Sequence, residues 1–287
     1  GTQIYRDGVL SNDGFDVLSR VIVSSGYVFV AADFLGLGIS NDVHPYIIKE
    51  PTANSVIDMI RATRNYFSEN PDIQLNRQLS IFGYSEGGYA TLAAQEMMEN
   101  SFSDEFDIMV SFPMAGPYDL SGTMMDKMLD GEIYAEPFYL PFLLNSYIHY
   151  YEMGSDENYF ISEFATEIPE LFNGNHGGGY INTYMNNNNY NPPILVMLPE
   201  IVNEFIENED YIFRQLLLEN NLYNWTPQSL TYLFHGMADH LVPYENSVVA
   251  YNHFIENGAT NVYLELLDES YGNHQDAAPY AILGAYG

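Results

Sequence analysis

The sequence contains no cysteine among its 287 residues, and no stretch approaches 18 consecutive apolar residues. The first absence excludes disulfide bridges, zinc–thiolate sites, iron–sulfur clusters and a cysteine nucleophile. The second leads us to expect no transmembrane helix and no stable membrane insertion. A hydrophobic fraction of 47% is nevertheless enough for a sizeable core, which excludes general disorder.

Basic residues are also scarce: 8 Lys and Arg stand against 39 Asp and Glu, giving a formal net charge of -31. A nucleic-acid partner requires a basic surface that neutralises phosphates, and eight basic residues scarcely supply one. We therefore exclude nucleic acid as a main partner and disfavour an anionic membrane surface. The summed field of the protein repels anions, so neutral or cationic substrates are expected.

Short apolar runs alternate with helix-like segments at both ends of the chain. The pattern predicts strands over residues 26–32, 78–82, 107–112, 229–234 and 261–267. It predicts intervening helices over residues 51–67, 87–97 and 245–257. Strand–helix–strand alternation with short links implies right-handed crossovers. The predicted fold is therefore α/β, with a doubly wound, mostly parallel sheet covered by helices on both faces.

The composition changes between these two regions. Residues 121–191 are rich in Tyr, Phe, Met, Asn and Gly, and a second helical portion spans residues 201–220. We predict an inserted, partly helical lid at residues 121–225, between core segments at residues 1–120 and 226–287. The alternative is a second packed subdomain with exposed tyrosines. Aromatic side chains supply contact area without charge, which suits a neutral ester in a pocket beneath such a lid.

The segment Gly83-Tyr84-Ser85-Glu86-Gly87 fits the pattern G-x-S-x-G, between a β-rich run and an Ala-rich helix. This spacing is typical of a sharp strand-to-helix turn that presents a serine hydroxyl above a sheet. The following helix N-terminus favours developing negative charge. Five residues alone match by chance often, and the alternative is an ordinary glycine loop between a strand and a helix.

Two later residues complete a constellation with Ser85. Asp239 lies in the loop just past the strand 229–234, where a histidine-orienting carboxylate is expected; the alternative is a capping aspartate. His274 follows Gly272 and Asn273 in a loop after the last strand, from which its imidazole can lie between Ser85 and Asp239. His235 is interpreted as closing a strand end. The remaining histidines have an ordinary structural or surface interpretation: His44, His149, His176, His240 and His253.

Taken together, these motifs resemble the α/β-hydrolase superfamily, within its secreted bacterial lipase and esterase branch. The chain order serine, acid, histidine is the order of that superfamily's triad. The residues that carry the resemblance are 26–38, the elbow at Ser85, the block 235–243 and the segment 272–274. The resemblance implies a serine hydrolase that cleaves carboxylic esters through an acyl-enzyme and requires no metal or organic cofactor.

The resemblance also bears on the first residues. Gly1-Thr2-Gln3 looks like the remainder of an oxyanion-loop motif in which a histidine precedes the glycine. We therefore expect a truncated N-terminus, with further strands and a signal peptide upstream, and hence a secreted or periplasmic protein. The implied oxyanion hole uses the backbone N–H of Glu86 and that of Thr2 or Gln3.

Three classes of function follow from the sequence. The first is an esterase or lipase acting on a small neutral ester. The second is a serine peptidase or aminopeptidase of the same fold, in which an acidic pocket holds a cationic N-terminus. The third is a non-catalytic binding module, against which the intact Ser85, Asp239 and His274 argue. Nitrophenyl esters compared with aminoacyl amides distinguish the first two classes.

Overall fold

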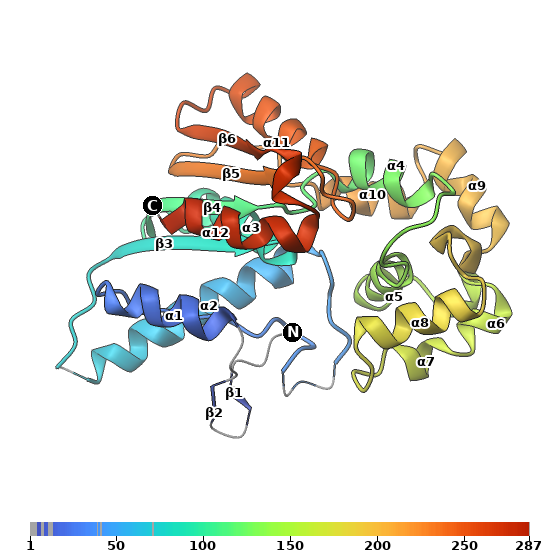
Figure 1. The fold of residues 1–287 in the computed structure, drawn as a ribbon, viewed down its shortest axis with the longest axis horizontal. Coiled ribbons are helices and arrows are strands. Elements are labelled where there is room, and N and C mark those ends of the chain that lie inside the picture. Colours follow the sequence, from blue (N-terminus) through green and yellow to red (C-terminus); the bar gives the residue numbers. More distant parts are fainter. Residues whose placement is uncertain are drawn as a thin grey trace.

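The computed structural model describes residues 5–6, 9–10, 14–38, 40, 42–70 and 72–286 (Figure 1). Its central element is a sheet of four parallel strands in the spatial order β3, β4, β5, β6. The strands span Gln78–Tyr84, Asp107–Met114, Leu230–Gly236 and Val262–Leu267. A short antiparallel pair, β1 (Tyr5–Arg6) and β2 (Val9–Leu10), forms a separate two-stranded sheet.

Helices link the strands in the way that parallel pairing requires. Helix α3 (Glu86–Ser101) connects β3 to β4, and α11 (Glu245–Glu256) connects β5 to β6. Helix α2 (Lys49–Ser68) precedes β3, and helix α1 (Gly14–Ser24) comes before it in the chain. Four of the five predicted strands and all three predicted helices are thus present, and the predicted α/β fold is confirmed.

Both faces of the sheet are covered, because successive residues of a strand point to opposite faces. On one face, Ile81 and Ile108 pack against α2 and α3 in a cluster with Ile57 and Met98. On the other face, the strands β3, β4 and β5 contact α12 (His274–Tyr286), which lies across the sheet in Figure 1. Cover on both faces agrees with the apolar residues that point to either side along the central strands β4 and β5.

The strand predicted at residues 26–32 is wrong. Residues 27–34 have no regular secondary structure, and the run lies outside the described sheet. Tyr27 is 61% exposed, and Val28 and Val30 are each 40% exposed. A β-rich run becomes a strand only when a neighbouring strand offers its backbone groups for pairing. No described strand does so here.

The segment between β4 and β5 is helical. Residues 115–229 contribute no strand to the sheet, and Figure 1 shows their helices beyond the carboxyl ends of the strands. The predicted helical portion 201–220 is two helices, α9 and α10, separated at residues 208–211. The α-helices of the segment are α4 (Met125–Leu129), α5 (Tyr139–Tyr150), α6 (Ser162–Ala165), α7 (Ile168–Leu171), α8 (Gly178–Asn187), α9 (Pro199–Glu207) and α10 (Ile212–Glu219). A π-helical turn at Leu120–Met124 opens the segment.

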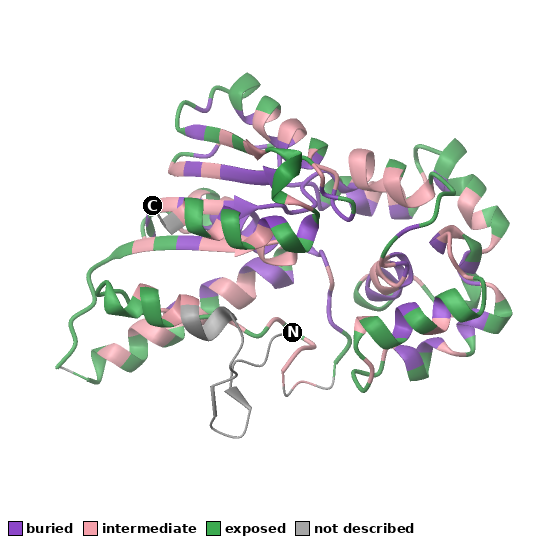
Figure 2. Cartoon of the chain, in the orientation of Figure 1, coloured by how far each residue is buried: buried purple, intermediate pink, exposed green. Residues whose placement is uncertain are grey.

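These helices share one apolar cluster with the helices that cover the sheet. Leu92 of α3 and Phe254 of α11 belong to the same cluster as Leu144 of α5, Phe164 of α6 and Phe213 of α10. Figure 2 shows buried residues along both β5 and α5. The segment is therefore packed against the rest of the protein through a continuous interior. Its assignment as a lid stays a prediction.

Among the described residues, no helix combines the length and the apolar character needed to cross a bilayer.

Candidate active site

Ser85 lies at the apex of a sharp turn between β3 and α3. Its backbone dihedrals are φ 59° and ψ −121°, a sparsely populated conformation for a residue with a side chain. Such strain costs on the order of 1–3 kcal/mol and is typical of functional turns. A Cβ atom at Gly83 would lie 2.2 Å from the carbonyl oxygen of Gly87, and one at Gly88 would lie 2.2 Å from that of Met114. Gly83 and Gly88 are therefore required for the close approach of the chain.

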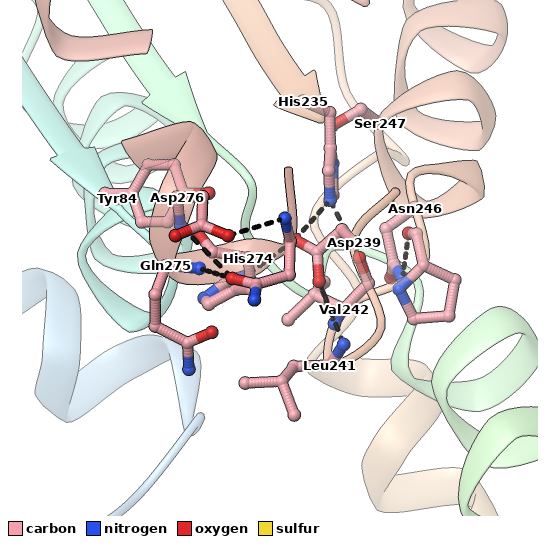
Figure 3. A network of polar contacts seen from close by, with 12 residues as sticks. Tyr84, His235, Asp239, Leu241, Val242, Asn246, Ser247, His274, Gln275 and Asp276 are labelled. Carbon is pink, nitrogen blue, oxygen red and sulfur yellow. Dashed lines mark hydrogen bonds and ion pairs between the residues drawn. The ribbon is translucent and has the colours of Figure 1, made fainter. Parts of the chain in front are cut away.

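Asp239 and His274 are in direct contact (Figure 3). The Nδ1 atom of His274 donates a hydrogen bond to Oδ2 of Asp239, since a carboxylate can only accept. The other carboxylate oxygen accepts from the backbone N–H groups of Leu241 at 2.9 Å and Val242 at 2.8 Å. The contact fixes the tautomer of His274 and leaves its Nε2 atom to act as a base.

Asp239 also has a second histidine beside it. Nε2 of His235 lies 3.3 Å from Oδ2 of Asp239 and 2.8 Å from the carbonyl oxygen of Val242, while Nδ1 lies 2.7 Å from the hydroxyl of Ser247. Burial alone would raise the pKa of Asp239, but the hydrogen bonds from His235 and His274 outweigh it and lower that pKa well below its usual value. His235, interpreted from the sequence as closing a strand, therefore also keeps Asp239 ionised.

Tyr84 restrains His274 from the other side. Its hydroxyl donates a 2.6 Å hydrogen bond to the backbone carbonyl of His274, and the two rings lie 5.0 Å apart. His274 is the first residue of α12, so this bond joins the start of that helix to the end of β3. Figure 3 shows Tyr84 and Asp239 on opposite sides of the imidazole. No sequence pattern indicates this role, because Tyr84 occupies a variable position of the G-x-S-x-G pattern.

Ser85 and His274 line the same cavity, which is partly open to solvent. No hydrogen bond joins the two side chains in the part of the chain that the structure describes. Three tyrosines also reach the wall, and the remaining lining is apolar, with four methionines among it: Met124, Met125, Met128 and Met197. The cavity thus offers a neutral, adaptable surface next to one hydroxyl and one imidazole.

Glu86 opens helix α3, so its backbone N–H is one of those that no helical carbonyl accepts. Its predicted role as a donor to an oxyanion stays a prediction. Thr2 and Gln3, the other predicted donors, lie outside the described residues. Within those described ranges, no group of three or more His, Asp or Glu side chains is arranged to hold a metal ion.

The comparisons with known proteins show the family and the fold of this chain. The model of the secretory lipase family matches residues 16–282. The chain belongs to the secretory lipase family. Its structure has the α/β-hydrolase fold of that lipase and esterase branch, as the resemblance implied. No curated protein sequence gives a significant match.

Solved structures of esterases are similar to this member of the family. The rice cell wall degrading esterase LipA from Xanthomonas oryzae is 28% identical, with a TM-score of 0.74 over 88% of this chain and 66% of that one. A candidate hydrolase from Legionella pneumophila is 26% identical, with a TM-score of 0.84 over 99% of this chain and 76% of that one. Lipase A from Candida antarctica, at 17% identity and a TM-score of 0.54, shares the fold over 84% of this chain and 56% of its own. The chain thus spans slightly less than two thirds of the Xanthomonas esterase.

Proposed function

We propose that the protein is a carboxylic ester hydrolase with Ser85 as nucleophile, His274 as general base and Asp239 as the acid that orients it. The observation that carries the proposal is the His274–Asp239 contact beside a cavity that Ser85 also lines. The strained turn at Ser85 and the membership in the secretory lipase family support the same conclusion. The family's name also supports a secreted or periplasmic location.

The reaction proceeds by two acyl transfers. Nε2 of His274 accepts the proton of the Ser85 hydroxyl while the oxygen attacks the ester carbonyl carbon. The carbonyl oxygen then carries a negative charge, to which the backbone N–H of Glu86 donates, with a second donor from the N-terminal residues. The imidazolium returns its proton to the leaving alcohol. Water, activated by the same imidazole, then attacks the acyl-enzyme, the Ser85–acyl bond breaks, and Ser85 regains its proton.

The cavity favours an ester over an amine-terminated peptide. Its wall contains methionine, leucine, phenylalanine and tyrosine, and none of the described residues that line it is an aspartate or glutamate that could hold a cationic N-terminus. We therefore place the peptidase second. Many apolar lining residues come from residues 121–225, which we propose as a cap that encloses the acyl group above a core formed by residues 1–120 and 226–287.

Replacement of Ser85 by alanine tests the proposal. We expect the turnover of a nitrophenyl ester to fall by about 10³-fold or more, because the nucleophile is lost, and labelling by a fluorophosphonate to disappear. Ser68→Ala, which removes an exposed hydroxyl at the end of α2, is the matched control and keeps both. Undiminished hydrolysis by the Ser85→Ala variant contradicts the proposal, and faster cleavage of aminoacyl amides than of esters favours the peptidase.

A further inference from the structure

A second histidine–carboxylate pair lies directly behind the candidate oxyanion donor. His44 is buried, at 5% exposure, and its Nε2 atom lies 2.6 Å from Oε1 of Glu86. Its Nδ1 atom lies 2.7 Å from the backbone carbonyl oxygen of Leu35. The sequence pattern assigned His44 an ordinary structural interpretation, and Glu86 only a backbone role.

The two contacts of His44 define the charge of the pair. A carbonyl oxygen accepts only, so Nδ1 carries a proton. The 2.6 Å contact between Nε2 and Oε1 requires a second proton between them, on the imidazole or on the carboxyl group. In the first arrangement an imidazolium faces a carboxylate, and in the second both groups are neutral. The net charge of the pair is zero in either arrangement.

The carboxyl group of Glu86 lies within electrostatic reach of the cavity. Burial is the main cause that raises the pKa of Tyr139 to about 12, and the charges of Glu136 and Glu86 add to it. The pKa of Tyr46 is raised above its usual value by burial, then by Tyr139 and by Glu86. Both tyrosines line the cavity together with Ser85. An unpaired carboxylate here would therefore repel negative charge that develops on a bound ester.

We propose that His44 is a positioning residue that neutralises Glu86, so that the oxyanion formed at Ser85 meets the N–H of residue 86 without a neighbouring negative charge. The inference rests on the proposed function, since it concerns the same tetrahedral intermediate. A carboxylate one residue after the nucleophile works against catalysis unless a cation or a shared proton compensates it, because its charge repels the charge of the oxyanion.

The surroundings of His44 hold the imidazole in this place. Its ring stacks on that of Phe34 with centroids 6.1 Å apart, and it contacts the rings of Tyr46 and Phe142 at 6.0 and 6.1 Å. Phe142 belongs to α5, so aromatic rings reach the imidazole from two distant parts of the chain. These contacts hold the imidazole with its Nε2 atom facing Glu86.

Three variants test the inference: His44→Gln, Glu86→Gln and the double variant. Glutamine at position 44 can still donate a hydrogen bond to Glu86, but it leaves the carboxylate charge uncompensated. We expect the kcat of His44→Gln on a neutral nitrophenyl ester to fall by about 10–100-fold, somewhat less than the roughly 10²–10³-fold loss on removing an oxyanion donor. Its KM stays within about twofold, since the neutral ground state is indifferent to the charge. We expect the kcat of the double variant to lie within about threefold of that of Glu86→Gln, because without the carboxylate there is no charge for His44 to neutralise.

The matched control is His176→Gln, which alters another histidine–glutamate pair, with Glu170, at 3.3 Å; neither of its residues lines the cavity. We expect kcat to be unaffected there. A trifluoromethyl ketone, whose adduct with serine carries the oxyanion, should lose affinity for His44→Gln by a factor similar to the loss in kcat. A purely structural role for His44 would instead give a double variant at least as impaired as His44→Gln.

Several outcomes overturn the inference. These are an unchanged kcat in His44→Gln and a double variant no better than His44→Gln. If His44→Gln does not fold, as judged by thermal melting, Glu86→Gln decides alone: a more than tenfold lower kcat shows that the acid itself is needed and contradicts neutralisation. Activity that persists in Ser85→Ala removes the proposed function and this inference together, whereas normal dependence on Ser85 with an unaffected His44→Gln removes the inference alone.

Discussion

His274 is held by two side chains, and a third side chain holds one of these two. Asp239 binds its Nδ1 atom, Tyr84 binds its backbone carbonyl, and His235 fixes Asp239 in turn. Each contact restricts the imidazole to a position facing the cavity. Catalysis by a general base depends on such restriction, because small displacements of the reacting groups lower the rate steeply.

The hydroxyl of Tyr84 can be removed without removing its ring. In Tyr84→Phe, the 2.6 Å bond to the carbonyl of His274 is lost while the ring contact remains. We expect kcat for a neutral ester to fall by about threefold to tenfold, since a hydrogen bond of about 1 kcal/mol no longer restrains the start of α12. Steady-state kinetics measure the effect, with Tyr66→Phe, at 63% exposure, as control. A kcat equal to that of the unaltered protein would show that Tyr84 acts on packing alone.

The sequence predicted the positions of Ser85, Asp239 and His274 because all three follow predicted strands, whose carboxyl ends meet at one edge of a parallel sheet. The supporting residues follow no such rule. Tyr84 and His274 are 190 positions apart, and His44 and Glu86 are 42 apart. Their contacts depend on how loops and helix ends pack, and the spacing of residues along the sequence does not predict this packing.

At the scale of the elements, one side chain links the beginning of the helical segment between β4 and β5 to the last part of that segment. This side chain is Asn221. Oδ1 of Asn221 accepts from the backbone N–H groups of Leu120 at 2.7 Å and Ser121 at 3.2 Å. Its Nδ2 atom donates to the hydroxyls of Ser121 and Tyr223 at 2.7 and 2.8 Å. All four hydrogen-bonding positions of the amide are therefore used, and the side chain is 3% exposed.

Replacement of Asn221 by leucine should destabilise the protein strongly. The backbone N–H groups of Leu120 and Ser121 would stay buried without their acceptor, and each such loss costs about 1–3 kcal/mol. We expect the free energy of unfolding to fall by about 2–4 kcal/mol, measured by urea titration. Asn208→Leu, which loses an exposed amide in the link between α9 and α10, is the control and should change it little. Equal stability of the two variants would contradict the inference that Asn221 stabilises the contact between the two ends of the helical segment.

The elements also show where sequence patterns stop being informative. The strands β3, β4, β5 and β6 were predictable because each carries a short run rich in apolar residues between helices. Residues 26–32 carry an equally β-rich run, yet they form no strand, because pairing depends on a neighbour that the run itself does not contain. The helices α5 to α8 were expected only as a partly helical region, since Asn, Gly and Tyr give weak helical periodicity.

At the scale of the whole molecule, the many carboxylates of the chain lie away from the cavity wall. Among the described residues, the cavity wall contains one histidine and no Asp, Glu, Lys or Arg, whereas the chain as a whole has a formal net charge of -31. The negative charges therefore surround a neutral site rather than line it. Their summed field should act on the approach of a substrate and not on the chemistry at Ser85.

This arrangement predicts that ionic strength affects anionic esters selectively. We expect kcat/KM for a nitrophenyl ester with a carboxylate on its acyl chain to rise several-fold between about 10 and 150 mM NaCl, because the Debye length falls from roughly 30 to 8 Å. A neutral ester of the same length should change little, and kcat for both should stay nearly constant, since salt acts on encounter. Steady-state kinetics on the matched pair measure the difference. A parallel response of the two esters would mean that the net charge of -31 exerts no field at the cavity, and would reverse the expectation that neutral substrates are preferred.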